Sequence, residues 1–450
     1  MKKIFQYIIL AVVTIVMASC TSDIEEPTAT TGKNNVQLVV GEFPAFGDSQ
    51  TRAIGTPDEG KTSWAEGDEL LLVIDNTSYG SHSATFTYNG KSWELTSGEL
   101  AYREGDPAYI PHVYYAPNYK WEAGKLVLKE GKDPGTDEYI EGKARITGNG
   151  ETITVSFAEA TRKYSRLRIA TLPNEQITVD TEYFTPAGSS DMKWDQNYAL
   201  TSDEKGNAYL YGTFENNSEV TVKYREAALT TYTFSQATES AKSYALDATV
   251  ISANSAEEIK SAIEQKVADG KTTIRLNLAP NAGTNEFMAI REAIKGAAPN
   301  DLGTIELTII GVETIPEEAF YKMLQLKSVR MSDVKEIKKY AFKECQYLTV
   351  VEAPSLNKLC SGAFKKCDQL AKLTFGPINY ADERNWPIFE YITPNIDLIL
   401  SDYQKEMIET DSYLYTANND RDYAGSDEHN SKNFLGREFK SITCRRYRVE

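Results

Sequence analysis

Residues 319–326 read AFYKMLQL, residues 341–348 read AFKECQYL and residues 363–370 read AFKKCDQL. The Ala-Phe pair begins at positions 319, 341 and 363, which is a constant period of 22, and a leucine ends each stretch. Apolar residues at fixed offsets with a period of about 20–29 residues are typical of a stack of coils, in which each coil buries its apolar face against its neighbours. The sequence therefore predicts a repeat architecture in the second half of the chain.

The same period extends through further apolar positions. Four sets align with it: Val312, Val334 and Leu356; Ile315, Ile337 and Leu359; Met323, Cys345 and Cys367; Val329, Val351 and Leu373. Leu307 lies one period before Val329, so one earlier strand belongs to the stack. This spacing resembles the BspA-type leucine-rich repeat of bacterial surface proteins, with clear repeats over 310–376. The resemblance implies an α/β leucine-rich-repeat solenoid in this half.

The repeat domain is expected to span residues 251–450 and to carry a cap at each end, because the outer coils of a stack otherwise expose apolar surface. Apolar residues have helical spacing within 255–269, and a second helix is expected over 286–295; both belong to the N-terminal side of the repeats. Strands are expected over 273–278, 305–309 and 396–400.

Four cysteines follow Cys20 in the sequence: Cys345, Cys360, Cys367 and Cys444. Cys345 and Cys367 share the repeat position of Met323, so they are expected as small apolar core residues. Stacked coils could also bring the two thiols close enough for a disulfide, and this alternative stays open. The sequence has no CxxC pair and three histidines, so no zinc site is expected.

Residues 1–19 have the pattern of a secretory signal. Two lysines precede an apolar run over 4–17, and small residues lead to Cys20. The run is shorter than the roughly 20 residues that a spanning helix needs. Residues 17–20 read MASC and resemble a bacterial lipobox, which implies cleavage before Cys20 and a lipid on its thiol. We therefore expect attachment to a membrane through Cys20; ordinary signal cleavage is the alternative.

Acidic residues follow the expected lipid at Asp23, Glu25 and Glu26. This patch resembles the surface-export signal of lipoproteins in the Bacteroidetes, and the resemblance implies a protein on the outer face of the cell outer membrane. Residues 20–35 are polar and poor in large apolar side chains, as expected of a tether that holds a folded domain away from the membrane.

Residues 36–250 contain short apolar or alternating runs separated by turn residues. Examples are VQLVV at 36–40, LLLVI at 70–74 and ATFTY at 84–88. Asn89-Gly90 follows the last run and predicts a hairpin, because both residues accept positive φ. Many short strands with regular turns favour antiparallel β-sandwich architecture. We expect one sandwich over 36–160 and a second over 161–250.

Several short motifs carry a second resemblance. They are, in order, Thr51-Arg52-Ala53, WAEGD at 64–68, Tyr88-Asn89-Gly90 with Trp93, and YYAP at 114–117. This order is similar to that of fimbrillin-like proteins of the Bacteroidetes. The resemblance implies two fimbrillin-like sandwiches and assembly by strand exchange, in which main-chain hydrogen bonds supply affinity. It also marks Arg52 as a counterpart of the family's protease-processing site, although an ordinary surface arginine is the alternative.

The chain is strongly acidic, with a net charge of −17. A polyanion of this kind is a poor partner for nucleic acid and is repelled by anionic lipid and glycan. The C-terminal residues run against this trend at Arg437, Lys440, Arg445, Arg446 and Arg448. These charges could form an anion-binding patch or protect an edge strand from pairing.

The sequence shows no arrangement of catalytic residues, and no enzyme activity, cofactor or metal is expected. Residues 55–62 read GTPDEGKT and fit the P-loop pattern, but Trp64 to Asp68 predicts a turn where a phosphate-binding helix should begin. Residues 420–425 suggest a calcium loop, but Ala424 and Ser431 stand where ligands belong, so a polar turn is expected.

The expected function is that of a cell-surface lipoprotein in adhesion. Its partner would be a host or bacterial surface protein or glycan, bound through the repeat domain. Two alternatives remain open: a fimbria-associated subunit that contacts other fimbrial subunits, and a surface lipoprotein that captures glycans for nutrient uptake.

Overall fold

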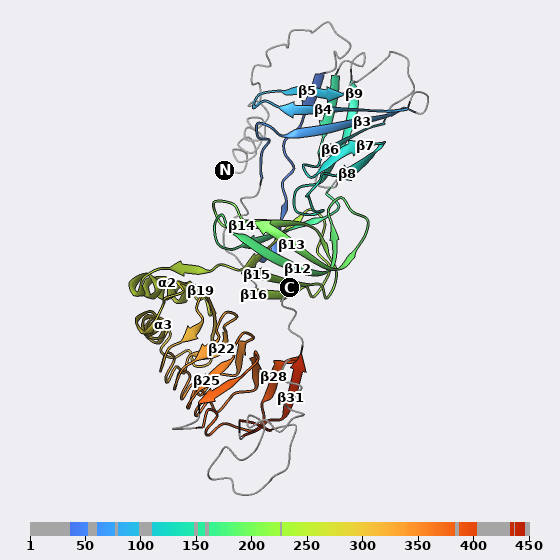
Figure 1. The fold of residues 1–450 in the computed structure, drawn as a ribbon. Coiled ribbons are helices and arrows are strands. Elements are labelled where there is room, and N and C mark those ends of the chain that lie inside the picture. Colours follow the sequence, from blue (N-terminus) through green and yellow to red (C-terminus); the bar gives the residue numbers. More distant parts are fainter. Residues whose placement is uncertain are drawn as a thin grey trace, which may run out of the picture. The chain divides into compact units, whose positions relative to one another are not determined.

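The computed structural model describes residues 37–52, 61–76, 80–98, 110–147, 152–157, 162–225, 227–382, 387–402, 433–435 and 437–445. The protein is mainly β, with several separate sheets (Figure 1). Two compact units divide the chain. The described residues of the first lie within 37–44, 61–129 and 139–161, and those of the second lie within 45–60, 130–138 and 162–450.

The first unit is built on one seven-stranded sheet. Its order is β1 (Gln37–Val40), β10 (Thr152–Ser156), β9 (Ile140–Thr147), β6 (Ile110–Tyr115), β3 (Glu69–Asn76), β4 (Gly80–Tyr88) and β5 (Trp93–Gly98). β1 is parallel to β10, and the other pairs are antiparallel. A short hairpin, β7 (Tyr119–Glu122) and β8 (Lys125–Leu128), lies outside this sheet.

Alternating residues of these strands form the core of the first unit, since successive side chains of a strand point to opposite faces. Leu70 and Leu72 of β3, Phe86 of β4 and Val113 of β6 are almost fully buried. The hairpin predicted at Asn89-Gly90 is present, with Tyr88 opposite Trp93. The strands expected in this region are therefore largely confirmed.

The second unit begins with a mixed, mainly antiparallel sheet, here called the mixed sheet. Its order is β16 (Ala227–Thr233), β15 (Glu219–Tyr224), β12 (Gln176–Pro186), β14 (Asn207–Phe214), β11 (Ser165–Ala170), β17 (Lys242–Asp247) and β2 (Gly47–Arg52), with β13 (Lys193–Thr201) paired to β12. β17 is parallel to both of its neighbours. A cluster that includes Phe184, Leu210, Phe214 and Val222 forms its core.

Two segments that the sequence assigned to the first sandwich belong to the second unit instead. β2 adds to the edge of the mixed sheet beside β17. Within 130–138, the carboxylate of Glu138 pairs with the buried guanidinium of Arg162 at 2.5 Å. The ring centre of Phe46 lies 3.8 Å from that guanidinium and 4.3 Å from that of Arg166. These contacts connect both segments to the mixed sheet. The observed division differs from the expected one in these two segments, whereas the last part of the first unit ends at residue 161.

The rest of the described part of the second unit is made mainly of parallel strands and of two helices, α2 (Ala256–Ala268) and α3 (Thr284–Ala297). The larger sheet, here called the wide sheet, has the order β18 (Ile251–Ala253), β19 (Thr273–Leu278), β20 (Ile305–Ile310), β22 (Leu326–Arg330), β24 (Val350–Ala353), β26 (Lys372–Phe375), β28 (Asp397–Ser401) and β31 (Ser441–Arg445). The narrow sheet has the order β21 (Thr314–Ile315), β23 (Glu336–Ile337), β25 (Lys358–Cys360) and β27 (Tyr380–Asp382).

Each period of the sequence supplies one strand to each of these sheets. Val329, Val351 and Leu373 pair in register along the wide sheet, and Ile315, Ile337 and Leu359 pair along the narrow one. The coils over 305–401 are called the repeat stack below. A short hairpin of β29 (Asn433–Phe434) and β30 (Arg437–Glu438) precedes the last strand.

A column of phenylalanine rings runs through the repeat stack. Phe320 and Phe342 stack at a centroid distance of 5.1 Å, and Phe342 and Phe364 stack at 5.4 Å. Phe389 continues the column at 5.7 Å from Phe364. It stands three positions later than the period predicts, so the sequence pattern missed this coil.

Aromatic rings also close the column at both ends. Phe287 of α3 meets Phe320 edge-on at 5.7 Å, and Phe439 meets Phe389 edge-on at 5.6 Å. Ser255 caps the N-terminus of α2, and its hydroxyl accepts a hydrogen bond from the backbone N–H of Glu258. The helical N-terminal layer that the sequence predicts is therefore present.

Cys345 and Cys367 form a second column beside the rings and are both free thiols. The Sγ of Cys345 donates to the carbonyl of Phe320 at 2.9 Å, and that of Cys367 donates to the carbonyl of Phe342 at 3.0 Å. Both side chains are fully buried. The structure therefore agrees with the expectation of core residues and contains no Cys345–Cys367 disulfide.

Candidate functional site

The wide sheet has one buried face and one outer face. Leu307, Val329 and Leu373 point into the core of the stack, so their neighbours along each strand point outward. Pairing in register arranges the outward residues in rows across the strands. One row contains Arg275, Thr308, Arg330, Glu352 and Thr374, and another contains Thr273, Glu306, Ser328, Val350 and Lys372.

The mixed sheet covers one part of this outer face. Ile310, at the end of β20, belongs to the hydrophobic core of the mixed sheet. The Nε of Arg275 donates to the carbonyl of Leu229 in β16 at 2.6 Å, and the side chain of Arg275 is 6% exposed. These contacts place β16 beside the first strands of the wide sheet and leave a cavity between them.

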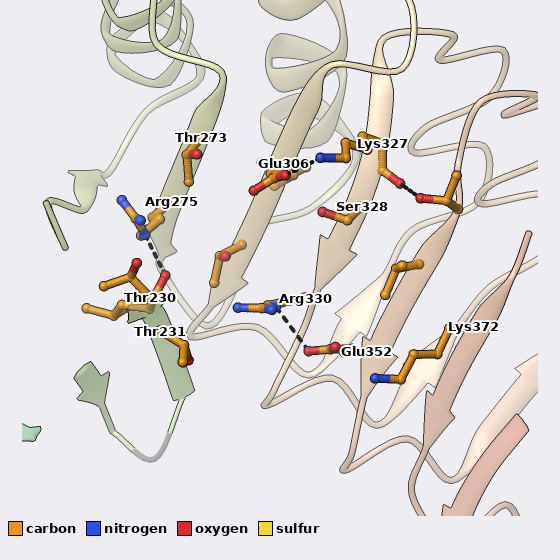
Figure 2. Close-up of a pocket in the computed structure, with 15 residues that line it drawn as sticks. Thr230, Thr231, Thr273, Arg275, Glu306, Lys327, Ser328, Arg330, Glu352 and Lys372 are labelled. Carbon is orange, nitrogen blue, oxygen red and sulfur yellow. Dashed lines mark hydrogen bonds and ion pairs between the residues drawn. The ribbon is translucent and has the colours of Figure 1, made fainter. Parts of the chain in front are cut away.

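The cavity has a volume of about 400 Å³ and opens to solvent. It is called the Arg275 cavity below. Figure 2 shows Thr230 and Thr231 beside Arg275 on one side, Arg330 and Glu352 in the middle, and Lys372 on the far side. The residues that line it are Leu229, Thr230, Thr231, Thr273, Arg275, Glu306, Leu307, Thr308, Lys327, Ser328, Arg330, Thr349, Val350, Glu352 and Lys372.

The lining has four cationic side chains and two carboxylates, so its formal charge is positive although the protein carries −17. The carboxylates form two ion pairs, Lys327–Glu306 at 2.8 Å and Arg330–Glu352 at 3.0 Å. Lys372 is exposed and has no ion-pair partner among the described residues. A local excess of positive charge therefore faces the cavity.

Many polar groups of the lining remain available to a ligand. Within the part of the chain that the structure describes, the hydroxyls of four lining residues make no hydrogen bond; these are Thr230, Thr273, Thr308 and Ser328. A guanidinium carries five N–H donors. Arg275 uses one of them in its hydrogen bond to Leu229, and its Nη1 lies 3.9 Å from the carboxylate of Asp247.

Neighbouring charges and hydrogen bonds keep Arg275 protonated and Asp247 ionised. Burial lowers the pKa of Arg275, and the negative charge of Asp247 opposes this change. An arginine nevertheless stays protonated in proteins. Burial on its own would raise the pKa of Asp247, but hydrogen bonds from Thr249 and the charges of Lys266 and Arg275 hold it below its ordinary value. Asp247 is therefore a carboxylate, and it balances part of the charge of Arg275.

The narrow sheet, like the wide sheet, pairs charges between neighbouring coils. Lys335 pairs with Glu313 at 2.5 Å, and Lys358 pairs with Glu336 at 2.7 Å. Lys358 also lies 5.2 Å from the ring centre of Tyr380 in the next coil. The wide sheet is the better candidate for a ligand face because its cavity also presents Lys372 and four hydroxyls that have no partner among the described residues.

The residues that the sequence marked for lipidation and export, Cys20, Asp23, Glu25 and Glu26, lie outside the described residues. Arg52 is the last residue of β2, where its backbone pairs with Ala245 of β17. The cysteine and acidic residues thus remain predictions, and Arg52 is placed on an edge strand of the mixed sheet.

The WAEGD motif has a structural role in the first unit. Asp68 accepts hydrogen bonds from the backbone N–H of Ala65 at 2.7 Å and from the Tyr115 hydroxyl at 3.0 Å. Its carboxylate also pairs with the ammonium of Lys61 at 2.7 Å. Lys61 is the lysine of the P-loop-like letters, so here it is held by an acidic residue of the following turn.

Other proposed motifs contribute little to this site. The calcium-like residues 420–425 lie outside the described residues. Among the described residues, no three His, Cys, Asp or Glu side chains are grouped to hold a metal ion. Lys440 pairs with Asp397 at 3.0 Å, and Arg445 belongs to β31, the last strand in the wide-sheet order. This placement favours edge protection over an anion-binding patch.

Sequence reasoning missed the Arg275 cavity, although part of the signal was present. Thr308, Arg330, Glu352 and Thr374 follow the same period as the core positions, so the alignment that found the core also orders the outward row. The remaining wall comes from β16, which is distant in sequence and has no repeat signal.

Comparison with known proteins supports the repeat assignment. A search of curated proteins found no match. A crystal structure of a "putative cell adhesion protein" from Bacteroides fragilis NCTC 9343 is similar at 11% identity over 48% of this chain and 93% of that chain, with a TM-score of 0.27. Residues 301–404 match the family model described as BspA type Leucine rich repeat region, in six copies. This part of the chain is therefore similar to BspA-type leucine-rich-repeat regions.

Proposed function

We propose that the protein is a surface adhesion protein without enzyme activity that binds its partner through the outer face of the wide sheet. The observation that carries this proposal is the Arg275 cavity on the wide sheet, where Lys372 and four hydroxyls have no partner among the described residues. The match of 301–404 to a BspA-type region supports the same function. A host or bacterial surface protein or glycan remains the proposed partner.

A substitution outside the Arg275 cavity tests the proposed face. Ile399 lies in the outward row of β28, in register with Thr374 and Thr443. Ile399→Arg should weaken binding of the intact protein to immobilised extracellular matrix or to whole bacteria, because it adds a long charged side chain at the contact surface. Thr314→Arg on the narrow sheet is the matched control. Equal binding by both variants and the unaltered protein would refute the assignment of the face.

We infer that the finer architecture follows the two resemblances, with fimbrillin-like sandwiches before residue 250 and a capped leucine-rich-repeat solenoid after it. In-register parallel pairing and the columns of buried side chains support the solenoid. The order of motifs around Asp68 supports the first sandwich only by resemblance. A role as an accessory fimbrial subunit follows from the same resemblance.

One observation favours this second role: β2 forms an edge of the mixed sheet and ends at Arg52. Cleavage after Arg52 would separate β2 from the rest of the chain and expose the edge of β17 to another strand. Fimbriae purified from the native cell should then contain this protein, and an Arg52→Ala variant should be absent from them. Fimbriae that lack the unaltered protein would refute this role.

We also propose that a lipid on Cys20 holds the protein at the outer membrane. In the part of the chain that the structure describes, no helix is long and apolar enough to cross a membrane. The lipobox-like residues 17–20 support the anchor. Cys20→Ala should move the protein from the membrane fraction to the soluble fraction. A variant that still sediments with membranes would refute the proposal.

A further inference from the structure

The Arg275 cavity presents both hydrogen-bond donors and acceptors. The donors come from the cationic side chains of Arg275, Arg330 and Lys372 and from hydroxyls that have no partner among the described residues. The acceptors include the carboxylates of Glu306 and Glu352. A ligand that matches this lining carries negative charge in one part and hydroxyl donors in another.

The volume narrows the class of ligand further. At about 400 Å³ the cavity lies within the range of about 300–1,000 Å³ that small-molecule sites occupy. A single small inorganic anion would leave most of the lining hydroxyls without a partner. A sugar ring has the size and the hydroxyl groups to reach several walls, and a carboxylate on that ring would match the planar donors of an arginine.

The two glutamates argue against more highly charged ligands. Glu306 and Glu352 lie on the outer face beside the cations, and they would repel a chain with many closely spaced sulfates or phosphates. An extended acidic peptide is also a poorer match, because the wide-sheet strands that line the cavity are paired on both sides and the carbonyl of Leu229 in the edge strand β16 already accepts from Arg275. One carboxylate on a hydroxylated ring fits the balance of charges best.

We propose that the Arg275 cavity binds one acidic sugar unit of a surface glycan, a hexose-sized ring with a single carboxylate. Arg275 and Arg330 bind the carboxylate, Lys372 adds charge at the open side, and Glu306 with the hydroxyls of Thr273, Thr308 and Ser328 binds the ring hydroxyls. This inference rests on the proposed function and specifies the chemical group that the adhesion face recognises.

The first test is a calorimetric titration of the intact protein with glucuronate, glucose and inorganic sulfate. Glucuronate should bind, and its affinity should fall with added salt, because screening weakens the attraction between charges. Glucose and sulfate should bind at least about tenfold more weakly, since each lacks one half of the recognised chemistry. Equal binding of glucose or of sulfate would overturn the acidic-sugar assignment.

The second test uses one exposed and one half-buried side chain of the outer face, whose substitution leaves the core intact. Lys372→Glu and Arg330→Gln should each weaken glucuronate binding by about tenfold or more, since each removes a charged donor. Lys338→Glu is the matched control: Lys338 is exposed, makes no ion pair with another described residue and lies outside the cavity. Unaltered glucuronate affinity in both cavity variants would overturn the proposal.

A competition experiment separates this inference from the function on which it rests. If the protein adheres to a surface and free glucuronate fails to compete, the adhesion function stands and the cavity assignment falls. If glucuronate binds in the cavity but the protein adheres neither to matrix nor to bacteria, the adhesion function falls and the cavity assignment stands. Adhesion that free glucuronate inhibits in the unaltered protein and that Lys372→Glu weakens supports both.

Discussion

The repeat stack and the mixed sheet bury aromatic and polar side chains in different ways. In the stack, the same phenylalanine–phenylalanine contact recurs between neighbouring coils. It joins Phe320, Phe342, Phe364 and Phe389 in turn. In the mixed sheet, Arg162 and Glu138 form a buried pair between segments that no repeat relates. The stack therefore distributes its stability over many similar contacts, while the mixed sheet depends on contacts that occur once.

The largest expected effect tests this dependence in the mixed sheet. Arg162→Met should lower the free energy of unfolding by about 3–5 kcal/mol, because it leaves the carboxylate of Glu138 buried without its cation. The double variant Arg162→Met/Glu138→Met should recover most of that loss. Urea unfolding monitored by circular dichroism measures both. A loss below about 1 kcal/mol in the single variant would mean that the pair contributes no more than an exposed one.

A smaller effect is expected from one member of a column. Cys345→Ala should cost about 1–2 kcal/mol, since it removes the thiol that donates to Phe320 and leaves space in a packed core. Cys360→Ala, at a partly exposed position, should cost less and serves as the control. Equal losses measured by urea unfolding would contradict the structural importance of the cysteine column.

The pH dependence of the same thiol sharpens the comparison. Burial raises the pKa of Cys345 to about 12, above its value in the unfolded chain of about 8.5. The resulting stability is fully present below pH 8.5 and is lost as the pH rises towards 12. Unfolding titrations between these limits should show this loss in the unaltered protein, and Cys345→Ala should reduce it. Rapid alkylation of Cys345 in the folded protein would contradict the burial of the thiol.

The smallest effect is expected from the ion pairs between coils. Lys335→Ala should lower the free energy of unfolding by about 0.2–1 kcal/mol, because its pair with Glu313 is exposed to solvent. High salt should reduce the difference. Lys338→Ala, which breaks no ion pair among the described residues, should leave the unfolding midpoint nearly unchanged. A loss that persists at high salt would indicate packing of the lysine stem rather than charge.

The same contrast explains how much could be predicted from the sequence. The constant period predicted the register of the stack and the burial of Val329, Val351 and Leu373, because each coil repeats the same environment. It missed Phe389 because three additional residues shift that coil out of the period. It also missed the positions of β2 and Glu138, since contacts made once leave no pattern along the chain.

The candidate site combines residues that follow the repeat period with residues that are brought together by contacts made once. The outward row with Arg330 and Glu352 follows from the period, whereas the burial of Arg275 depends on β16 and could not be read from spacing. The net charge of the chain gave a wrong indication of the ligand, because it also averages over residues that the fold separates. A value of −17 describes the whole chain and argued against anionic glycans, while the lining of the cavity is locally positive. Ligand chemistry follows the residues that a fold brings together, not their average.

The edge-on rings of Phe287 and Phe439 limit where a new repeat can be added to the stack during evolution. Since both ends of the ring column are closed, a new coil can enter only between existing ones, where each junction resembles the next. Tandem duplication of the gene segment that encodes one period would meet this condition without rebuilding either end. Each added copy would lengthen the wide sheet by about 4.8 Å, one strand spacing. The length of the repeat stack can therefore evolve in steps of one coil, while the residues that close its two ends stay unchanged.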